Sequence, residues 1–93
     1  MPDSADVLLE GPITVHTVPV IAHRVLAQLD AGARRVDFAR VTEVDSAAIA
    51  LALECQRNAA ARGGSVSILN LPESLRNLAN LYGVIDLIDG PAA

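Results

Sequence analysis

The sequence predicts an α/β domain in which three helices cover a small, mostly parallel or mixed β-sheet. Three observations predict this fold. The chain has 93 residues, which suits a single domain spanning 1–93. Strand-like and helix-like segments alternate three times along it. Hydrophobic residues make up 52% of the chain but aromatic residues only 2%, so Ala, Val, Leu and Ile dominate, as suits helices laid closely on a sheet.

The first strand and the first helix are separated by turn-forming residues. Val7–Leu9 is a short apolar run, and residues 10–12 (Glu-Gly-Pro) predict a turn after it, beyond which Ile13–Val15 is an alternative continuation as extended chain. Thr17 is the expected N-cap of a helix that carries Pro19 in its first turn, where the missing N–H has no intrahelical partner to lose. Gly32 is placed to end this helix.

The second strand is followed by the strongest helix signal in the chain. Arg34–Phe38 alternates, which predicts a strand with Val36 and Phe38 on one face, and a loop is expected from there to Asp45. Ser46–Arg62 is rich in Ala and Leu, the best helix formers, and its polar residues gather in its later turns.

The last third of the chain predicts a strand, a helix and an apolar tail. Ser65–Leu69 is rich in β-branched residues and reads as a strand. Pro72 begins a third helix, and Gly83 stands at the position expected of its C-terminal cap. Val84–Ile88 is apolar and fits either a final strand or a short helix.

Charge and composition exclude several functions. There are 11 acidic and 7 basic residues, and every basic residue is Arg, so lysine-dependent phosphate loops and Schiff-base chemistry are excluded. The net charge of −4 and the scarcity of aromatic residues predict no nucleic-acid binding. No apolar run reaches the roughly 20 residues of a bilayer span, and no secretory leader opens the chain. We therefore expect a cytoplasmic protein without direct membrane insertion.

No constellation of residues predicts catalysis or metal binding. His16 and His23 have no third ligand at a fitting spacing and read as surface or capping residues. Glu43 and Asp45 are two apart, but no nucleophile or oxyanion donor accompanies them. Cys55 lies in mid-helix, where a small apolar packing role is expected. We expect no catalytic residue, no metal ligand and no cofactor.

Ser46 is the residue that stands out. It follows Asp45 at the start of the Ala-rich helix, where either side chain would cap exposed N–H groups. A hydroxyl at this point is also accessible, and a phosphate on it would meet the positive end of the helix dipole. Such a phosphate adds a charge of about −1.5 to −2 and would disturb any partner docked there.

The run VDFARVTEVDSAA, residues 36–48, resembles the central signature of STAS domains. Asp45 and Ser46 match the Asp-Ser/Thr pair of that signature, and Ala47 and Ala48 fall where Gly is common. The resemblance implies that these four residues form a partner-binding or regulatory surface, with Ser46 as a possible phosphorylation site. It implies no catalysis by this chain.

A later run, LRNLANLYGV at residues 75–84, is similar to a helix of the MlaB branch of the family. That resemblance implies a non-enzymatic subunit that binds the MlaF-like ATPase of an ABC phospholipid transporter involved in outer-membrane lipid asymmetry. Such a subunit would lie at the inner face of the inner membrane through its partner. The alternative is an anti-sigma-factor antagonist, released from its partner when a kinase phosphorylates Ser46. A small hydrolase is disfavoured because no nucleophile–base pair is evident.

The sequence departs from the STAS pattern at two places. The family usually opens with an additional strand, for which only residues 1–6 are available here, so we expect that strand to be short or absent. Ala47 and Ala48 replace the common Gly pair, which still permits close approach but adds two methyl groups.

Overall fold

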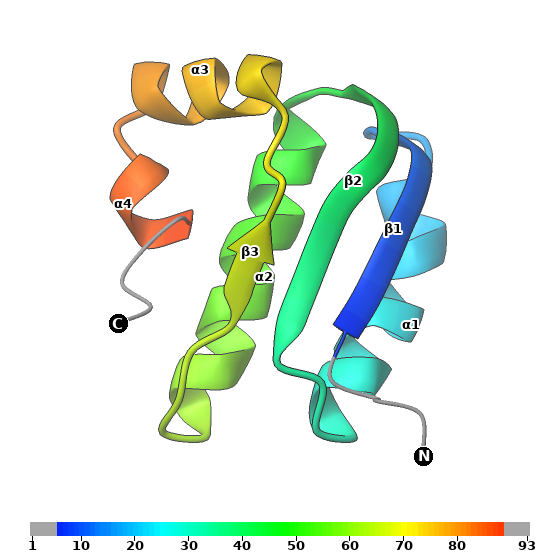
Figure 1. The fold of residues 1–93 in the computed structure, drawn as a ribbon, viewed down its shortest axis with the longest axis vertical. Helices are drawn as coiled ribbons and strands as arrows, with labels where there is room; N and C mark the ends of the chain where they lie inside the picture. Colours follow the sequence, from blue (N-terminus) through cyan, green and yellow to red (C-terminus); the bar gives the residue numbers. More distant parts are fainter. Residues whose placement is uncertain (1–5, 89–93) are drawn as a thin grey trace.

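The computed structural model describes residues 6–88, and its strands and helices alternate as expected. The three strands are parallel and lie in the order β1-β2-β3, so the fold is α/β with a wholly parallel sheet (Figure 1). The elements are β1 (Asp6–Ile13), α1 (Val18–Asp30), β2 (Arg35–Val44), α2 (Ser46–Ala61), β3 (Ser67–Leu69), α3 (Glu73–Leu81) and α4 (Ile85–Ile88). The apolar tail therefore forms a fourth, short helix. The expected short or absent opening strand falls mainly on residues outside 6–88.

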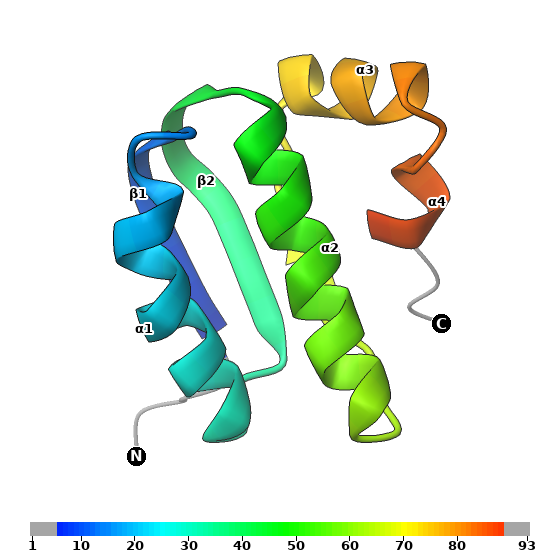
Figure 2. The same cartoon turned by 180° about the vertical axis from the view of Figure 1, so that it is seen from behind.

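Helices α1 and α2 cover one face of the sheet, and no helix within residues 6–88 covers the other face (Figures 1 and 2). Sequential parallel strands joined by crossovers of one hand place both connecting helices on the same side. Helices α3 and α4 pack against α2 and against each other at the β3 side of the molecule. None of the helices within residues 6–88 is long and apolar enough to cross a bilayer.

The core lies between the sheet and the helices that cover it. Val36 and Phe38 are buried on the same face of β2, as their spacing predicts, while Asp37 lies on the opposite face. Each core element contributes small or branched apolar side chains, so the layers approach closely. The fully buried side chains of greatest volume are Phe38, Leu9, Ile13, Leu29, Leu75, Ile88, Val7, Val25, Val36 and Cys55.

The turn predicted at residues 10–12 is wrong, because β1 continues through it to Ile13. Gly11 has φ +74°, and the pairing of β1 with β2 shifts register on both sides of it, between Leu8 and Glu10 and between Gly11 and Pro12. An edge strand tolerates Pro, and a bulge uses the positive φ that Gly adopts readily. Gly11 and Pro12 therefore mark an irregularity within the edge strand β1 and not the end of that strand.

The loop predicted after Phe38 is also wrong for most of its length, because β2 extends to Val44. Its second half pairs with the continued part of β1, with Val41 opposite Gly11 and Val44 opposite Ile13. This segment forms a strand because it pairs with β1, which is distant in the sequence, and the local sequence does not indicate this pairing. The third strand is shorter than predicted and starts at Ser67.

The other helix boundaries follow the sequence closely. Helix α2 begins at Ser46 and has Arg62 as its C-cap, and Pro72 is the N-cap of α3. Gly83 follows the C-cap with φ +74°, the left-handed conformation that commonly ends a helix at glycine. Tyr82 is exposed, although its spacing from Leu75 and Leu78 places it in the same apolar series.

Candidate functional site

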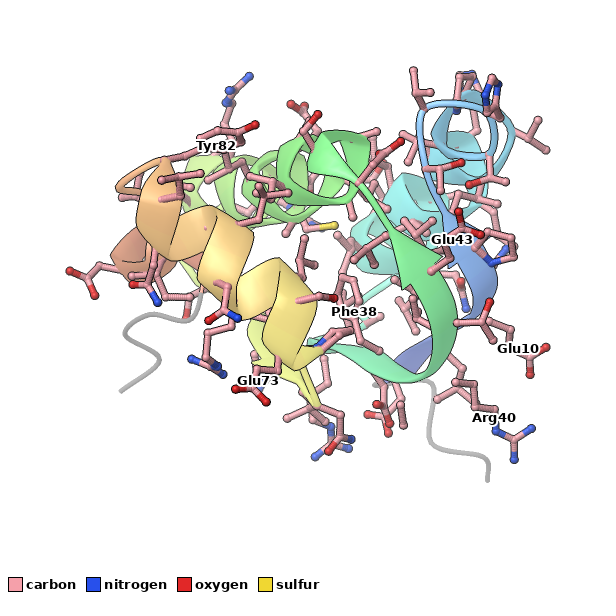
Figure 3. All side chains as sticks on the ribbon, turned by 90° about the horizontal axis from the view of Figure 1, so that it is seen from above. Glu10, Phe38, Arg40, Glu43, Glu73 and Tyr82 are labelled. Carbon is pink, nitrogen blue, oxygen red and sulfur yellow. The ribbon has the colours of Figure 1, made fainter. Side chains whose placement is uncertain are left out.

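The candidate site lies where the carboxyl ends of β1 and β2 meet the first turns of α1 and α2. Parallel topology brings these ends to one edge of the sheet, which is where α/β domains commonly bind ligands. Figure 3 looks down on this end of the molecule, with Glu43 beside the turn that leads into α1. Ser46 is exposed here as the first residue of α2.

Asp45 is the cap of α2, so the choice between Asp45 and Ser46 is settled in favour of the carboxylate. Its backbone is extended, and its Oδ1 accepts a hydrogen bond from the Ala47 N–H at 2.8 Å. Its Oδ2 accepts a second hydrogen bond, from the Val15 N–H at 3.0 Å. The Ser46 hydroxyl is released from capping and makes no hydrogen bond within residues 6–88.

The turn at residues 14–17 is held together by its own threonines. The Thr17 Oγ1 accepts from the Thr14 N–H at 2.8 Å and donates to the Pro12 carbonyl at 2.9 Å. The Thr14 carbonyl accepts from the backbone N–H groups of Thr17 and Val18, at 3.0 and 2.9 Å. Thr17 therefore occupies the N-cap position of α1, but its hydroxyl serves the turn and makes no cap hydrogen bond, unlike the prediction.

This compact turn presents apolar side chains to solvent next to the start of α2. Val15 is 60% exposed, and Val20, in the first turn of α1, is 76% exposed. Beside the turn lies a cleft of about 410 Å³, lined by Pro12, Thr14, His16, Thr17, Glu43 and Asp45. No three His, Cys, Asp or Glu side chains within residues 6–88 are placed to share a metal ion. The end of the molecule around Ser46 thus offers apolar surface, hydroxyls and carboxylates.

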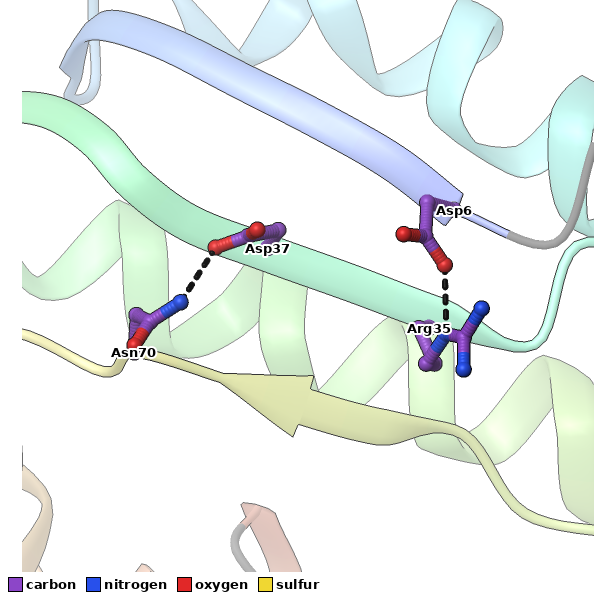
Figure 4. A network of polar contacts seen from close by, with 4 residues as sticks. All are labelled: Asp6, Arg35, Asp37 and Asn70. Carbon is purple, nitrogen blue, oxygen red and sulfur yellow. Dashed lines mark hydrogen bonds and ion pairs between the residues drawn. The ribbon is translucent and has the colours of Figure 1, made fainter. Parts of the chain in front are cut away.

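Asp37 and the two acidic residues singled out in the sequence, Glu43 and Asp45, make different contacts. Asp37 lies on the helix-free face of the sheet, where its Oδ1 accepts from the Asn70 side chain at 2.9 Å (Figure 4). The same oxygen accepts from the Ala39 N–H at 2.8 Å. Asp45 is engaged by two backbone N–H groups, and Glu43 is exposed at the end of β2. Glu43 and Asp45 line the same cleft, but none of these three carboxylates is hydrogen-bonded to another.

The two alanines that replace the usual glycines differ in position. Ala48 is fully buried and contributes its methyl group to the core beneath the site, whereas Ala47 is half-buried. The predicted surface therefore consists chiefly of Asp45, Ser46 and Ala47, supported from within by Ala48. Val15 belongs beside them but was not predicted, because only tertiary packing brings it there.

Cys55 is buried in the core, as its position in mid-helix predicts. Desolvation by burial, reinforced by the negative charge of Glu54, raises the pKa of the Cys55 thiol from 9.0 to about 12. A thiol in this state is a poor nucleophile.

A family model and a solved structure each match most of this chain. The family model described as "Mlab, STAS domain" matches residues 2–89. Among solved structures, that of the anti-sigma factor antagonist SpoIIAA in its unphosphorylated form is similar, with 23% sequence identity and a TM-score of 0.64. The match covers 87% of this chain and 78% of that one, and at this identity it shows a shared fold. A search of curated proteins finds no match.

Proposed function

The chain belongs to the STAS domain family, and on that basis we propose that it is a non-enzymatic subunit that docks on the ATPase of an ABC phospholipid transporter. The observation that carries the proposal is the match of residues 2–89 to the family model named for Mlab. The partner would be an MlaF-like ATPase, and the system would serve outer-membrane lipid asymmetry. The protein would be cytoplasmic, held at the inner face of the inner membrane by its partner.

The proposed docking surface is the end of the molecule around Ser46. Within residues 6–88 the Ser46 hydroxyl makes no hydrogen bond, so it is available to bond to another protein, and Val15 nearby exposes apolar surface to be covered. The surroundings of Cys55 and Ser46 favour a binding role over a catalytic one. The Cys55 thiol is buried with a raised pKa, and no base is hydrogen-bonded to Ser46 within residues 6–88.

The test is copurification with the ABC ATPase subunit of the phospholipid transporter from the same organism. We expect the wild type to form a complex and Ser46→Glu to weaken it at least about tenfold, because the new charge must be desolvated at the interface. Ser74→Glu is the matched control, since Ser74 is also exposed in the first turn of a helix, α3. The proposal fails if the wild type does not bind, or if both variants bind equally well.

The second candidate is an anti-sigma-factor antagonist switched by phosphorylation. The observation that favours it is the fold shared with unphosphorylated SpoIIAA, together with an exposed serine at the start of α2. A phosphate on Ser46 would add a charge of about −1.5 to −2 next to Asp45 and so repel a docked partner.

Incubation with the kinase of a sigma-factor regulatory system, followed by mass spectrometry, separates the two candidates. Stoichiometric phosphate on Ser46 that is lost in Ser46→Ala, together with failure to bind the ABC ATPase, would favour the switch. Complex formation with the ATPase and an unmodified Ser46 would favour the transporter subunit.

A further inference from the structure

We infer that Asp45 is a positioning residue that clamps the turn at residues 14–17 to the first turn of α2, so that Val15 and Ser46 form one docking surface. The inference deepens the proposed function and rests on it for the identity of the partner. The clamp itself is a property of this chain alone, and it can be tested without any partner.

The clamp consists of two hydrogen bonds accepted by one side chain. The Asp45 Oδ1 takes the Ala47 N–H at 2.8 Å, and its Oδ2 takes the Val15 N–H at 3.0 Å, from a residue 30 positions earlier in the chain. If capping were the only role of this position, Ser or Asn would serve as well as Asp. An ionised carboxylate has two acceptor oxygens, and both are used here. Asp therefore fits the position because of the second contact.

The segment held by the clamp behaves as a single unit. The hydrogen bonds between Thr14 and Thr17 and the bond from the Thr17 hydroxyl to the Pro12 carbonyl fix the turn internally. Fixing Val15 at its backbone N–H therefore places the whole turn, including an apolar side chain that is 60% exposed. A partner that contacts Ser46 meets this apolar side chain at a set position, which lowers the ordering cost of binding.

The same geometry connects a modification of Ser46 to the turn. A phosphoryl group or an introduced carboxylate at Ser46 would compete with the adjacent Asp45 for the N–H groups at the start of α2 and repel its charge. Either change weakens the hydrogen bond that Asp45 accepts from the Val15 N–H. A charge at Ser46 thus alters the docking surface in two ways, by adding a charge and by releasing the turn.

The first experiment observes the clamp in the wild-type protein. A through-hydrogen-bond NMR correlation should join the amide nitrogen of Val15 to the side-chain carboxyl carbon of Asp45. Amide hydrogen exchange is then measured in Asp45→Ser and in the wild type. The serine side chain keeps a capping oxygen but is too short to reach the Val15 N–H. Exchange of the Val15 amide should rise about tenfold, as expected for the loss of a hydrogen bond to a charged group, with the Ala47 amide changed less than about twofold.

Asp86→Ser is the matched control, because Asp86 is exposed in α4 and its removal changes the net charge equally. The control should leave the Val15 amide unchanged. The clamp is refuted if the wild-type correlation is absent, or if Val15 exchanges at the same rate in Asp45→Ser and in the wild type. The wild-type correlation decides whether the hydrogen bond between Val15 and Asp45 exists, even if Asp45→Ser does not fold.

Binding to the ABC ATPase subunit then tests positioning separately from the clamp. We expect Asp45→Ser to weaken the complex about tenfold although Ser46 is unchanged, and Asp86→Ser to bind within about twofold of the wild type. Wild-type affinity in Asp45→Ser would refute the positioning role. A wild-type protein that does not bind the ATPase would refute the proposed function and the positioning role, while the NMR result would still decide the existence of the clamp.

Discussion

Gln56 joins three elements through its side-chain amide, and its removal should destabilise the domain more than its place on a polar helix face suggests. Its Nε2 donates to the carbonyls of Val66 and Ile88, at 2.7 and 3.0 Å, and its Oε1 accepts from the Val66 N–H at 3.1 Å. Helix α2 is thereby tied to the residue before β3 and to the end of α4. Truncation to Ala removes all three hydrogen bonds.

The magnitude follows from those contacts. Each hydrogen bond contributes about 0.5–1.5 kcal/mol net. Gln56 is half-buried, so water replaces part of the lost hydrogen bonding. Gln56→Ala should therefore lower the free energy of unfolding by about 2 kcal/mol. In a domain of this size, about 1 kcal/mol shifts Tm by about 4–8 °C, so the expected decrease is about 8–16 °C.

Urea unfolding followed by circular dichroism measures the effect, with Arg57→Ala as the control. Arg57 is the next residue on α2, is exposed, and pairs with Glu54 at 3.2 Å on the surface, where such pairs contribute about 0–1 kcal/mol. The bridging role of Gln56 is wrong if the two variants are equally stable.

A Gln56→Glu variant adds a test with a defined sign. Its carboxylate would face two carbonyl oxygens, so the folded state raises the pKa of the new carboxyl above the unfolded value of about 4.3. A raised folded-state pKa means that stability is fully present below the unfolded pKa and is lost as pH rises through the folded one. The deficit relative to the wild type should therefore be larger at pH 7 than near pH 4.

Four further predictions concern the core and the backbone. The thiol of Cys55, with its pKa raised to about 12, should react with a disulfide reagent at pH 8 at least about a hundredfold more slowly in native protein than in urea, and rapid native labelling would contradict its burial. Because the thiol ionises near 9.0 only when unfolded, the free energy of unfolding should fall between pH 9.0 and about 12, and Cys55→Ala should lack this component. Gly11→Ala should be about 1 kcal/mol more destabilising than Gly64→Ala in urea unfolding, because an added Cβ meets no close atom at either site and only Gly11 has a positive φ; equal effects would refute the strain argument. Phe38→Ala should cost about 3–5 kcal/mol, and a calorimetric Tm within a few degrees of the wild type would contradict its central place in the core.

Local sequence predicts most of the helices because their signals lie within a few residues. Ala and Leu content defines α2, the Pro72 position begins α3, and Gly83 ends it. The strands are predicted less well, since their lengths depend on pairing. The continuation of β1 past Gly11 requires β2 beside it, and a single strand shows nothing of this in its own sequence.

The candidate site shows the same division between local and tertiary signals. The Asp45-Ser46 pair at a helix start is visible in the sequence, and the structure places it there. The contact of Asp45 with Val15 is not visible, because it joins residues 30 apart whose proximity comes from the parallel order of β1 and β2. Gln56 is a similar case, since its polarity indicates solvent exposure but its amide bonds to Val66.

The helix-free face of the sheet is another surface on which a partner could dock, and its composition argues against that role. Polar and charged side chains from neighbouring segments pair across this face. The face also includes Leu8, on β1, which is 53% exposed. Two of the pairs on this face are shown in Figure 4. The pairs are Asp6–Arg35, Arg40–Glu10 and Asp37–Asn70.

Burying paired charges against a partner removes them from water, and the desolvation penalty of each ion is several kcal/mol unless the partner replaces the lost contacts. Val15 and Val20 carry no such penalty, because covering exposed apolar surface is favourable at about 25 cal/mol per Å². The paired charges of the helix-free face thus oppose docking, whereas the two exposed valines favour it. A partner that docks at the start of α2 gains from both valines and meets a carboxylate whose oxygens are already occupied by backbone N–H groups. Of these two surfaces, the energetics therefore favour the end of the molecule that the Asp45-Ser46 pair marks.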